Sequence, residues 1–135
     1  MGEDPSHHNP YARQQSYRQY LEERETKAMS DLSSYQMWTQ STAIYTNPII
    51  YPSLELAGEV GEVCNQVKKI YRDDEGVVTP KRKEDLEKEL GDVLWALARL
   101  IDDLGLDFNK VKELNVMKLE DRLQRNVIGG SGDNR

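Results

Sequence analysis

The chain has 135 residues, which is enough for one domain with a single core of ordinary size. Its charged fraction of 31% and apolar fraction of 37% suit helices that have one buried face and one solvated face. The formal net charge is −6 and no basic stripe is visible, which argues against nucleic-acid binding because an acidic surface repels a phosphate backbone.

Cys64 is the only cysteine, so no internal disulfide can form, and this fits a reducing cytoplasm. No apolar run approaches the roughly 18 residues of a membrane span. The first residues also lack the apolar segment of a secretory signal. We therefore expect a cytoplasmic protein without a membrane segment.

Residues 1–30 differ in composition from the rest of the chain. They contain both histidines, many Gln and Arg, and little aliphatic content. A helix over about 12–28 is compatible with this segment, although its apolar stripe is thin. We interpret residues 1–30 as a polar N-terminal extension, partly disordered or helical, that precedes a domain at 31–128.

The domain is expected to be all-α, because no stretch of it alternates in the manner of a strand. Caps and chain breakers predict four helices, at about 31–45, 53–71, 80–104 and 107–128. The expected caps are Ser30 or Asp31, Thr79 followed by Pro80, and Asp107. Asn47-Pro48 and Tyr51-Pro52 are expected to break the chain, and the glycine-rich tail 129–135 cannot form regular structure.

Two short motifs of one form stand in the second and third predicted helices. They are Glu59-Val60-Gly61-Glu62-Val63 and Glu89-Leu90-Gly91-Asp92-Val93. Positions three apart lie about 60° apart on a helix, so each motif points two carboxylates the same way. Apolar residues such as Leu56 and Ile70 or Leu86 and Ala96 border these acids, which places them on or beside faces that should be buried.

Carboxylates beside buried faces are costly without a partner, and four of them would repel one another. A cation is the usual remedy, and oxygen ligands favour Mg²⁺, with Mn²⁺ as a substitute. A solvated face is the alternative reading of a single pair of acids, but two matched pairs favour a site. Glu55 and Asp103 lie near the same faces and are either further members of the site or solvated.

Two glycines within helices and a polar stripe on the fourth helix each have a functional and a non-functional interpretation. Gly61 and Gly91 lie opposite the acids, where close approach of another helix or subunit would explain the cost of glycine within a helix; tolerated drift is the alternative. In the fourth helix, Asn115, Lys118 and Arg122 share a face with apolar residues and suit phosphate oxygens, unless they form a solvated stripe.

The combined motif resembles the MazG-like all-α nucleoside triphosphate pyrophosphohydrolases, which are related to dimeric dUTPases. The matching features are Glu-x-x-Glu, a spacer of 26 residues (63–88), Glu-x-x-Asp, the preceding Tyr51-Pro52 and the later Asn115-x-x-Lys118-Leu119-x-x-Arg122. The likeness covers about residues 31–135 and not 1–30. The tail resembles the ends of some phage and cyanobacterial members.

The resemblance implies hydrolysis of (deoxy)nucleoside triphosphates to monophosphate and pyrophosphate, for nucleotide-pool control or house-cleaning. It implies that Glu59, Glu62, Glu89 and Asp92 hold Mg²⁺, and that Asn115, Lys118 and less securely Arg122 bind phosphate. It also implies a four-helix-type bundle completed by a homodimer or homotetramer. We expect Glu59 or Glu62 to orient or deprotonate the attacking water.

The nucleotide base is expected to rest against aromatic side chains, with Tyr35, Trp38 and Trp95 as candidates and ordinary core packing as the alternative. A di-iron carboxylate bundle is disfavoured, because it needs histidine ligands and His7 and His8 lie outside the domain. A non-catalytic helical module for nucleotide binding or interaction is the remaining alternative. Base choice stays open, since it depends on the shape of a pocket.

Overall fold

The computed structural model describes residues 31–129, and no strand occurs among them. The helices are α2 (Leu32–Thr39), α3 (Ile50–Asp73), α4 (Pro80–Asp103) and α5 (Phe108–Gln124), with a 3₁₀ turn at Gln40–Thr42. The expected all-α class is therefore confirmed. The helix considered at about 12–28, the rest of the N-terminal extension and residues 130–135 lie outside the described residues.

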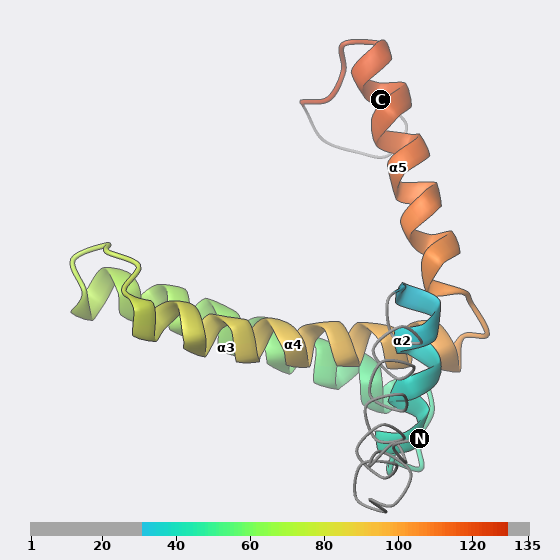
Figure 1. Cartoon of the computed structure of the whole chain (residues 1–135), viewed down its shortest axis with the longest axis horizontal. Coiled ribbons are helices and arrows are strands. Elements are labelled where there is room, and N and C mark those ends of the chain that lie inside the picture. The colour runs from blue at the N-terminus through green and yellow to red at the C-terminus, as the bar shows by residue number, and fades with distance from the viewer. Residues whose placement is uncertain (1–30, 130–135) are drawn as a thin grey trace, which may run out of the picture.

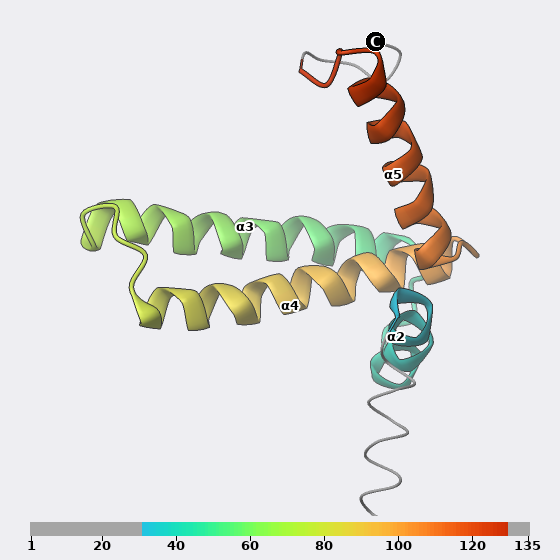
Figure 2. The same ribbon diagram turned by 45° about the horizontal axis from the view of Figure 1, so that its top comes forward.

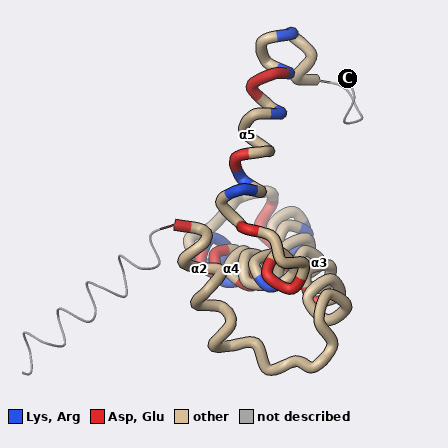
Figure 3. Tube along the Cα trace, turned by 90° about the vertical axis from the view of Figure 1, so that its right-hand side faces the viewer, with Lys and Arg blue, Asp and Glu red and all other residues tan. Residues whose placement is uncertain are grey.

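The two longest helices, α3 and α4, form an antiparallel hairpin, and the shorter helices gather at its open end (Figures 1 and 2). There α2 crosses the hairpin, whereas α5 leaves it at a steep angle and projects away (Figures 1 and 2). Figure 3 shows that the loop from α2 to α3 carries no charged residue, while α5 carries both signs. None of the helices over 31–129 is long and apolar enough to cross a membrane.

A small core lies where α2, α4 and α5 meet. Ala98, Ile101 and Phe108 are buried in it. Partly buried residues pack around these three: Leu32, Tyr35, Leu97 and Val111. The core therefore fixes the open end of the hairpin and leaves most of its length held only by contacts between α3 and α4.

Three helices begin at the caps that the sequence predicted. The Asp31 carboxylate accepts a hydrogen bond from the Ser34 N–H at 2.8 Å, and the Asp107 carboxylate accepts one from the Lys110 N–H at 2.8 Å. The Thr79 hydroxyl accepts one from the Arg82 N–H at 3.3 Å, with Pro80 in the first turn. Gly105 ends α4 with a φ of 68°, a backbone conformation that glycine adopts without strain.

The segment between α2 and α3 differs from the prediction. The first helix ends at Thr39 and its 3₁₀ extension at Thr42, rather than at about Tyr45. The next helix begins at Ile50 and includes Pro52 in its first turn, where the missing N–H is not needed. The prediction failed here because a contact with α4, distant in sequence, draws Tyr45 out of the helical path.

That contact is a buried polar network around Arg99, whose side chain is only 6% exposed. The Arg99 guanidinium donates to Asp102 at 2.9 Å and to Asp103 at 3.2 Å. The Tyr45 hydroxyl accepts from Arg99 Nε at 3.1 Å and donates to Asp103 Oδ2 at 2.9 Å. The same Asp103 oxygen accepts the N–H of Ile49, which has a positive φ of 65°. Asp103 thus holds the loop that enters α3.

We predict that Tyr45→Phe lowers the free energy of unfolding by about 1–2 kcal/mol, because two hydrogen bonds to charged partners lose their hydroxyl. Urea denaturation at matched protein concentration measures the change. Tyr71→Phe is the matched control, since the Tyr71 side chain lies on the exposed surface of α3. Equal stability of the two variants would show that the network does not hold the loop.

Candidate metal centre

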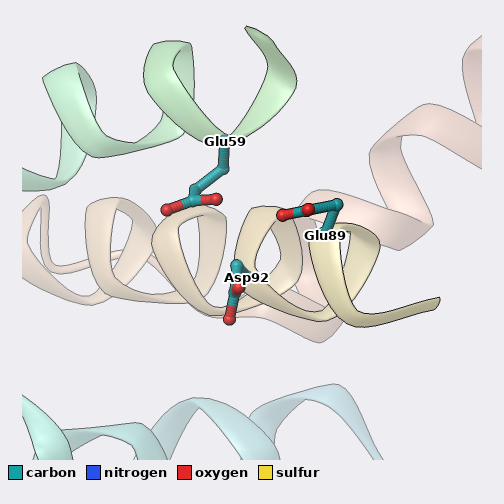
Figure 4. A group of neighbouring side chains, drawn as sticks. All are labelled: Glu59, Glu89 and Asp92. Carbon is teal, nitrogen blue, oxygen red and sulfur yellow. The ribbon is translucent and has the colours of Figure 1, made fainter. Parts of the chain in front are cut away.

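Three of the four predicted carboxylates meet between the long helices of the hairpin. Glu59 comes from α3, and Glu89 and Asp92 come from α4. Each contributes one carboxylate oxygen to a group whose atoms all lie within 4.8 Å of one another. Figure 4 shows Glu59 pointing from α3 toward α4, beside the two acids of α4. Glu59 and Glu89 are thirty residues apart in sequence, and they are neighbours because the hairpin packs its two motifs side by side.

Negative charges dominate the electrostatics of this group within residues 31–129. Burial raises the pKa of Glu59, and the negative charges of Asp92, Glu55, Glu89 and Glu62 raise it further. Glu59 and Glu89 are partly buried, and Asp92 is exposed. Converging oxygen donors with an unfavourable charge fit a hard divalent cation, which would relieve both the repulsion and the desolvation.

Glu62 is placed differently from the other three acids. It is exposed on α3, and its carboxylate is not among the oxygens that lie within 4.8 Å of one another. Its charge nevertheless contributes to the raised pKa of Glu59. Glu62 therefore lies at the edge of the group, one helical turn beyond Glu59.

Gln66 is a neighbour of the site that the sequence reasoning missed. It is buried in α3, with 8% of its surface exposed, and its amide Nε2 donates to Glu89 Oε1 at 3.3 Å. The signal was present in the spacing, since Gln66 lies seven residues after Glu59 and therefore on the same face of the helix. A polar residue continuing a carboxylate face toward buried Ile70 was the feature to notice.

The candidate aromatic residues lie on two elements near the open end of the hairpin. The Tyr35 and Trp38 rings stack, with centroids 5.9 Å apart. Burial raises the pKa of the Tyr35 hydroxyl, and the charge of Asp92 raises it further, which places Tyr35 near the acidic group. Trp95 donates its indole N–H to the Thr42 hydroxyl at 2.7 Å and meets Tyr45 edge to face. Tyr35 also packs against the core, so both readings of it have a structural basis.

The predicted phosphate-binding residues lie on α5, away from the acids. Asn115 and Lys118 are exposed, whereas Arg122 is buried with 6% of its surface exposed. The helix α5 projects from the end of the hairpin, away from the stretch where α3 and α4 lie side by side (Figures 1 and 2). The acids and the α5 residues form two separate groups within one chain.

Comparison with known proteins gives a family match and a phage relative. A family model described as the MazG nucleotide pyrophosphohydrolase domain matches residues 53–127, more than half of the chain. The Gene 37 protein of Mycobacterium phage L5 is 43% identical over 109 residues, which cover 75% of this chain and 96% of that protein. No solved structure matches the chain. The expectation drawn from the paired acidic motifs is confirmed, and the chain belongs to the MazG nucleotide pyrophosphohydrolase family.

Proposed function

We propose that the protein hydrolyses (deoxy)nucleoside triphosphates to the monophosphate and pyrophosphate in a Mg²⁺-dependent reaction. The observation that carries this proposal is the meeting of Glu59, Glu89 and Asp92 between α3 and α4. Family membership supports nucleotide pyrophosphate chemistry and a divalent cation. We also predict a physiological role in nucleotide-pool control or house-cleaning, and a cytoplasmic location.

In the proposed site, Glu59, Glu89 and Asp92 hold Mg²⁺, and Glu62 joins them by a change of side-chain rotamer. The cation, when bound, supplies positive charge to triphosphate oxygens, and Mn²⁺ is expected to substitute for it. Glu59 and Glu62 are the two candidate bases. One of them would orient the attacking water and take its proton.

We further propose that Tyr35 and Trp38 provide one wall for the nucleotide base. Tyr35 lies near enough to Asp92 for the carboxylate charge to raise its pKa, and its ring stacks on Trp38, so a base against Tyr35 would leave the triphosphate facing the carboxylates. Trp95 is less available for stacking, because its indole N–H and ring edge are engaged by Thr42 and Tyr45. Its contribution would be to hold the loop behind the site.

The proposed assembly is a homo-oligomer, with a dimer as its simplest form. The hairpin leaves apolar side chains exposed along both helices, including Val60 and Val67 on α3 and Leu90 and Leu94 on α4. A Cβ atom built on Gly61 or Gly91 would meet nothing within 4 Å, so the close approach expected there does not occur within the described part of the chain. A second hairpin packed on this face would cover the apolar residues and complete a four-helix bundle.

The exposed apolar residues of α5 support the same assembly. Leu114, Met117 and Leu123 are all more than half exposed on a helix that stands away from the hairpin. In a symmetric dimer, the α5 of one copy can reach a surface of the other. We propose that Asn115, Lys118 and Arg122 bind the triphosphate of the partner copy's site in this way.

The reaction is tested by pyrophosphate release from a panel of canonical dNTPs and NTPs, with Mg²⁺ and with EDTA. We expect release that requires the metal and that prefers one or two bases. Absence of release from every substrate, together with absence of thermal stabilisation by any triphosphate in Mg²⁺, would contradict the proposal. Stabilisation without release would instead favour the non-catalytic nucleotide-binding module.

A further inference from the structure

The amide of Gln66 bridges the acidic group and a cation farther along the hairpin. Its Nε2 donates to Glu89 Oε1 at 3.3 Å, and its Oε1 accepts from Arg82 Nη1 at 3.4 Å. Glu89 and Arg82 lie seven residues apart on α4, so both face α3 from the same side of their helix. Gln66 therefore occupies the interface between the helices and contacts both residues across it.

Arg82 is itself held in place by the turn that closes the hairpin. Its Nε donates to Asp74 Oδ2 at 2.6 Å, and the Asp73 carboxylate lies 3.7 Å from its Nη2. The Arg82 side chain is 17% exposed, so this pair is screened less than the surface pairs of the same helix. A chain of polar contacts thus runs from Asp74 through Arg82 and Gln66 to Glu89.

The chemistry of these groups gives the bridge a direction. A guanidinium has only donors, so it requires the oxygen of the Gln66 amide to face it. The amide NH₂ must then face Glu89, where it donates to a carboxylate that has only acceptors. If the amide were reversed, its NH₂ would face the guanidinium and its oxygen would face the carboxylate. Arg82 therefore selects the amide orientation that is favourable to Glu89.

The neutrality of the bridge also matters. A direct ion pair between Arg82 and Glu89 would neutralise the charge that a divalent cation needs from its ligands. An amide instead fixes the carboxylate by a hydrogen bond and leaves it anionic. The arrangement has the form of an outer-shell contact that orients a ligand without competing with the metal.

We propose that Gln66 is a positioning residue for Glu89 in the metal centre, and that the Arg82–Asp74 pair sets the orientation of its amide. This inference rests on the proposed function, because it takes Glu89 as a metal ligand. It adds two residues, Gln66 and Arg82, that act through the metal ligand Glu89 and do not contact the substrate.

The test is a Mn²⁺ titration of the metal-free full chain, followed by electron paramagnetic resonance without nucleotide. Gln66→Leu keeps a similar volume and removes both hydrogen bonds, and we expect it to weaken Mn²⁺ binding about 10-fold. Arg82→Met is expected to weaken binding in the same direction by a smaller factor. Far-UV circular dichroism checks that the variants fold. If Gln66→Leu does not fold, the Mn²⁺ affinity of Arg82→Met alone tests the inference.

Two matched controls separate positioning from a general loss of stability. Asn65→Leu changes the neighbouring amide, which pairs with Lys68 instead of α4, and should bind Mn²⁺ as the wild type does. Arg72→Met removes an exposed arginine that pairs with Asp73 at the same end of the hairpin, and should also leave binding unchanged.

A double variant shows whether the effect passes through Glu89. In the Glu89→Gln background, Gln66→Leu should cause no further loss of Mn²⁺ affinity. Wild-type affinity in both Gln66→Leu and Arg82→Met, or an equal loss with and without Glu89, would overturn the inference and leave the proposed function standing. Wild-type Mn²⁺ binding that does not depend on Glu89 would remove the proposed metal centre and the inference with it.

Discussion

Glu59→Gln is expected to lower pyrophosphate release by at least about 100-fold at saturating Mg²⁺, while leaving the helical content unchanged. Glutamine matches glutamate in size but offers no negative charge to a cation and takes no proton from water. The same substitution removes the residue whose pKa is raised by burial and, further, by the surrounding acids. Steady-state kinetics on the preferred triphosphate measures the loss.

Glu87→Gln is the matched control for this prediction. Glu87 is exposed on α4 and lies about 160° around the helix from Glu89, so it faces away from the acidic group. It should retain wild-type turnover although it loses the same unit of charge. Wild-type kcat in Glu59→Gln would remove Glu59 from the site, and equal losses in both variants would point to net charge as the cause.

The raised pKa of Glu59 gives the same variant a second readout that needs no substrate. A group whose pKa is higher in the folded than in the unfolded state favours folding when protonated, so its contribution is lost as pH rises through the folded pKa. In EDTA, the contribution of Glu59 to the stability of the wild type should therefore decrease as pH rises through that raised pKa. Glu59→Gln should lack this part of the pH dependence and unfold at a higher temperature at pH 7.

Local signals were enough to predict most of the helices. The helix caps act through backbone groups within a few residues, so they can be predicted from the local sequence; they are Asp31, Thr79, Asp107 and Gly105. The end of the first helix could not be predicted in this way. Tyr45 leaves the helical path for Arg99 and Asp103, more than fifty residues away, and helical spacing contains no information about such a partner.

The site shows the same division between local and distant causes. The three-residue spacing of Glu89 and Asp92 predicts a shared face, and the matched motif of α3 predicts that Glu59 belongs with them. The structure brings these three together and leaves Glu62 at the edge, because side-chain direction depends on packing between the helices. The spacing places Gln66 on the carboxylate face of α3, but its role as a bridge depends on two partners in α4, Glu89 and Arg82, that helical spacing within α3 does not identify.

The second large effect concerns Lys118 and the proposed partner copy. Lys118 lies ten residues after the start of α5, about 15 Å along a helix that points away from the hairpin. We expect Lys118→Ala to lower kcat/KM for the preferred triphosphate about 10- to 100-fold, because one cationic contact to phosphate is lost. Glu113→Ala, an exposed change on the same helix, is the control and should leave kcat/KM near the wild-type value.

Mixing two impaired variants distinguishes a site within one chain from a site shared by two. When Glu59→Gln and Lys118→Ala chains are refolded together, a dimer with shared sites has one intact site in each mixed pair, which restores about a quarter of wild-type activity at equal amounts. If each chain used its own Lys118, every site would lack one of the two groups and mixing would restore nothing. Recovery on mixing would therefore establish both the oligomer and the exchange of α5, because neither copy alone then holds the acids and the phosphate contact together.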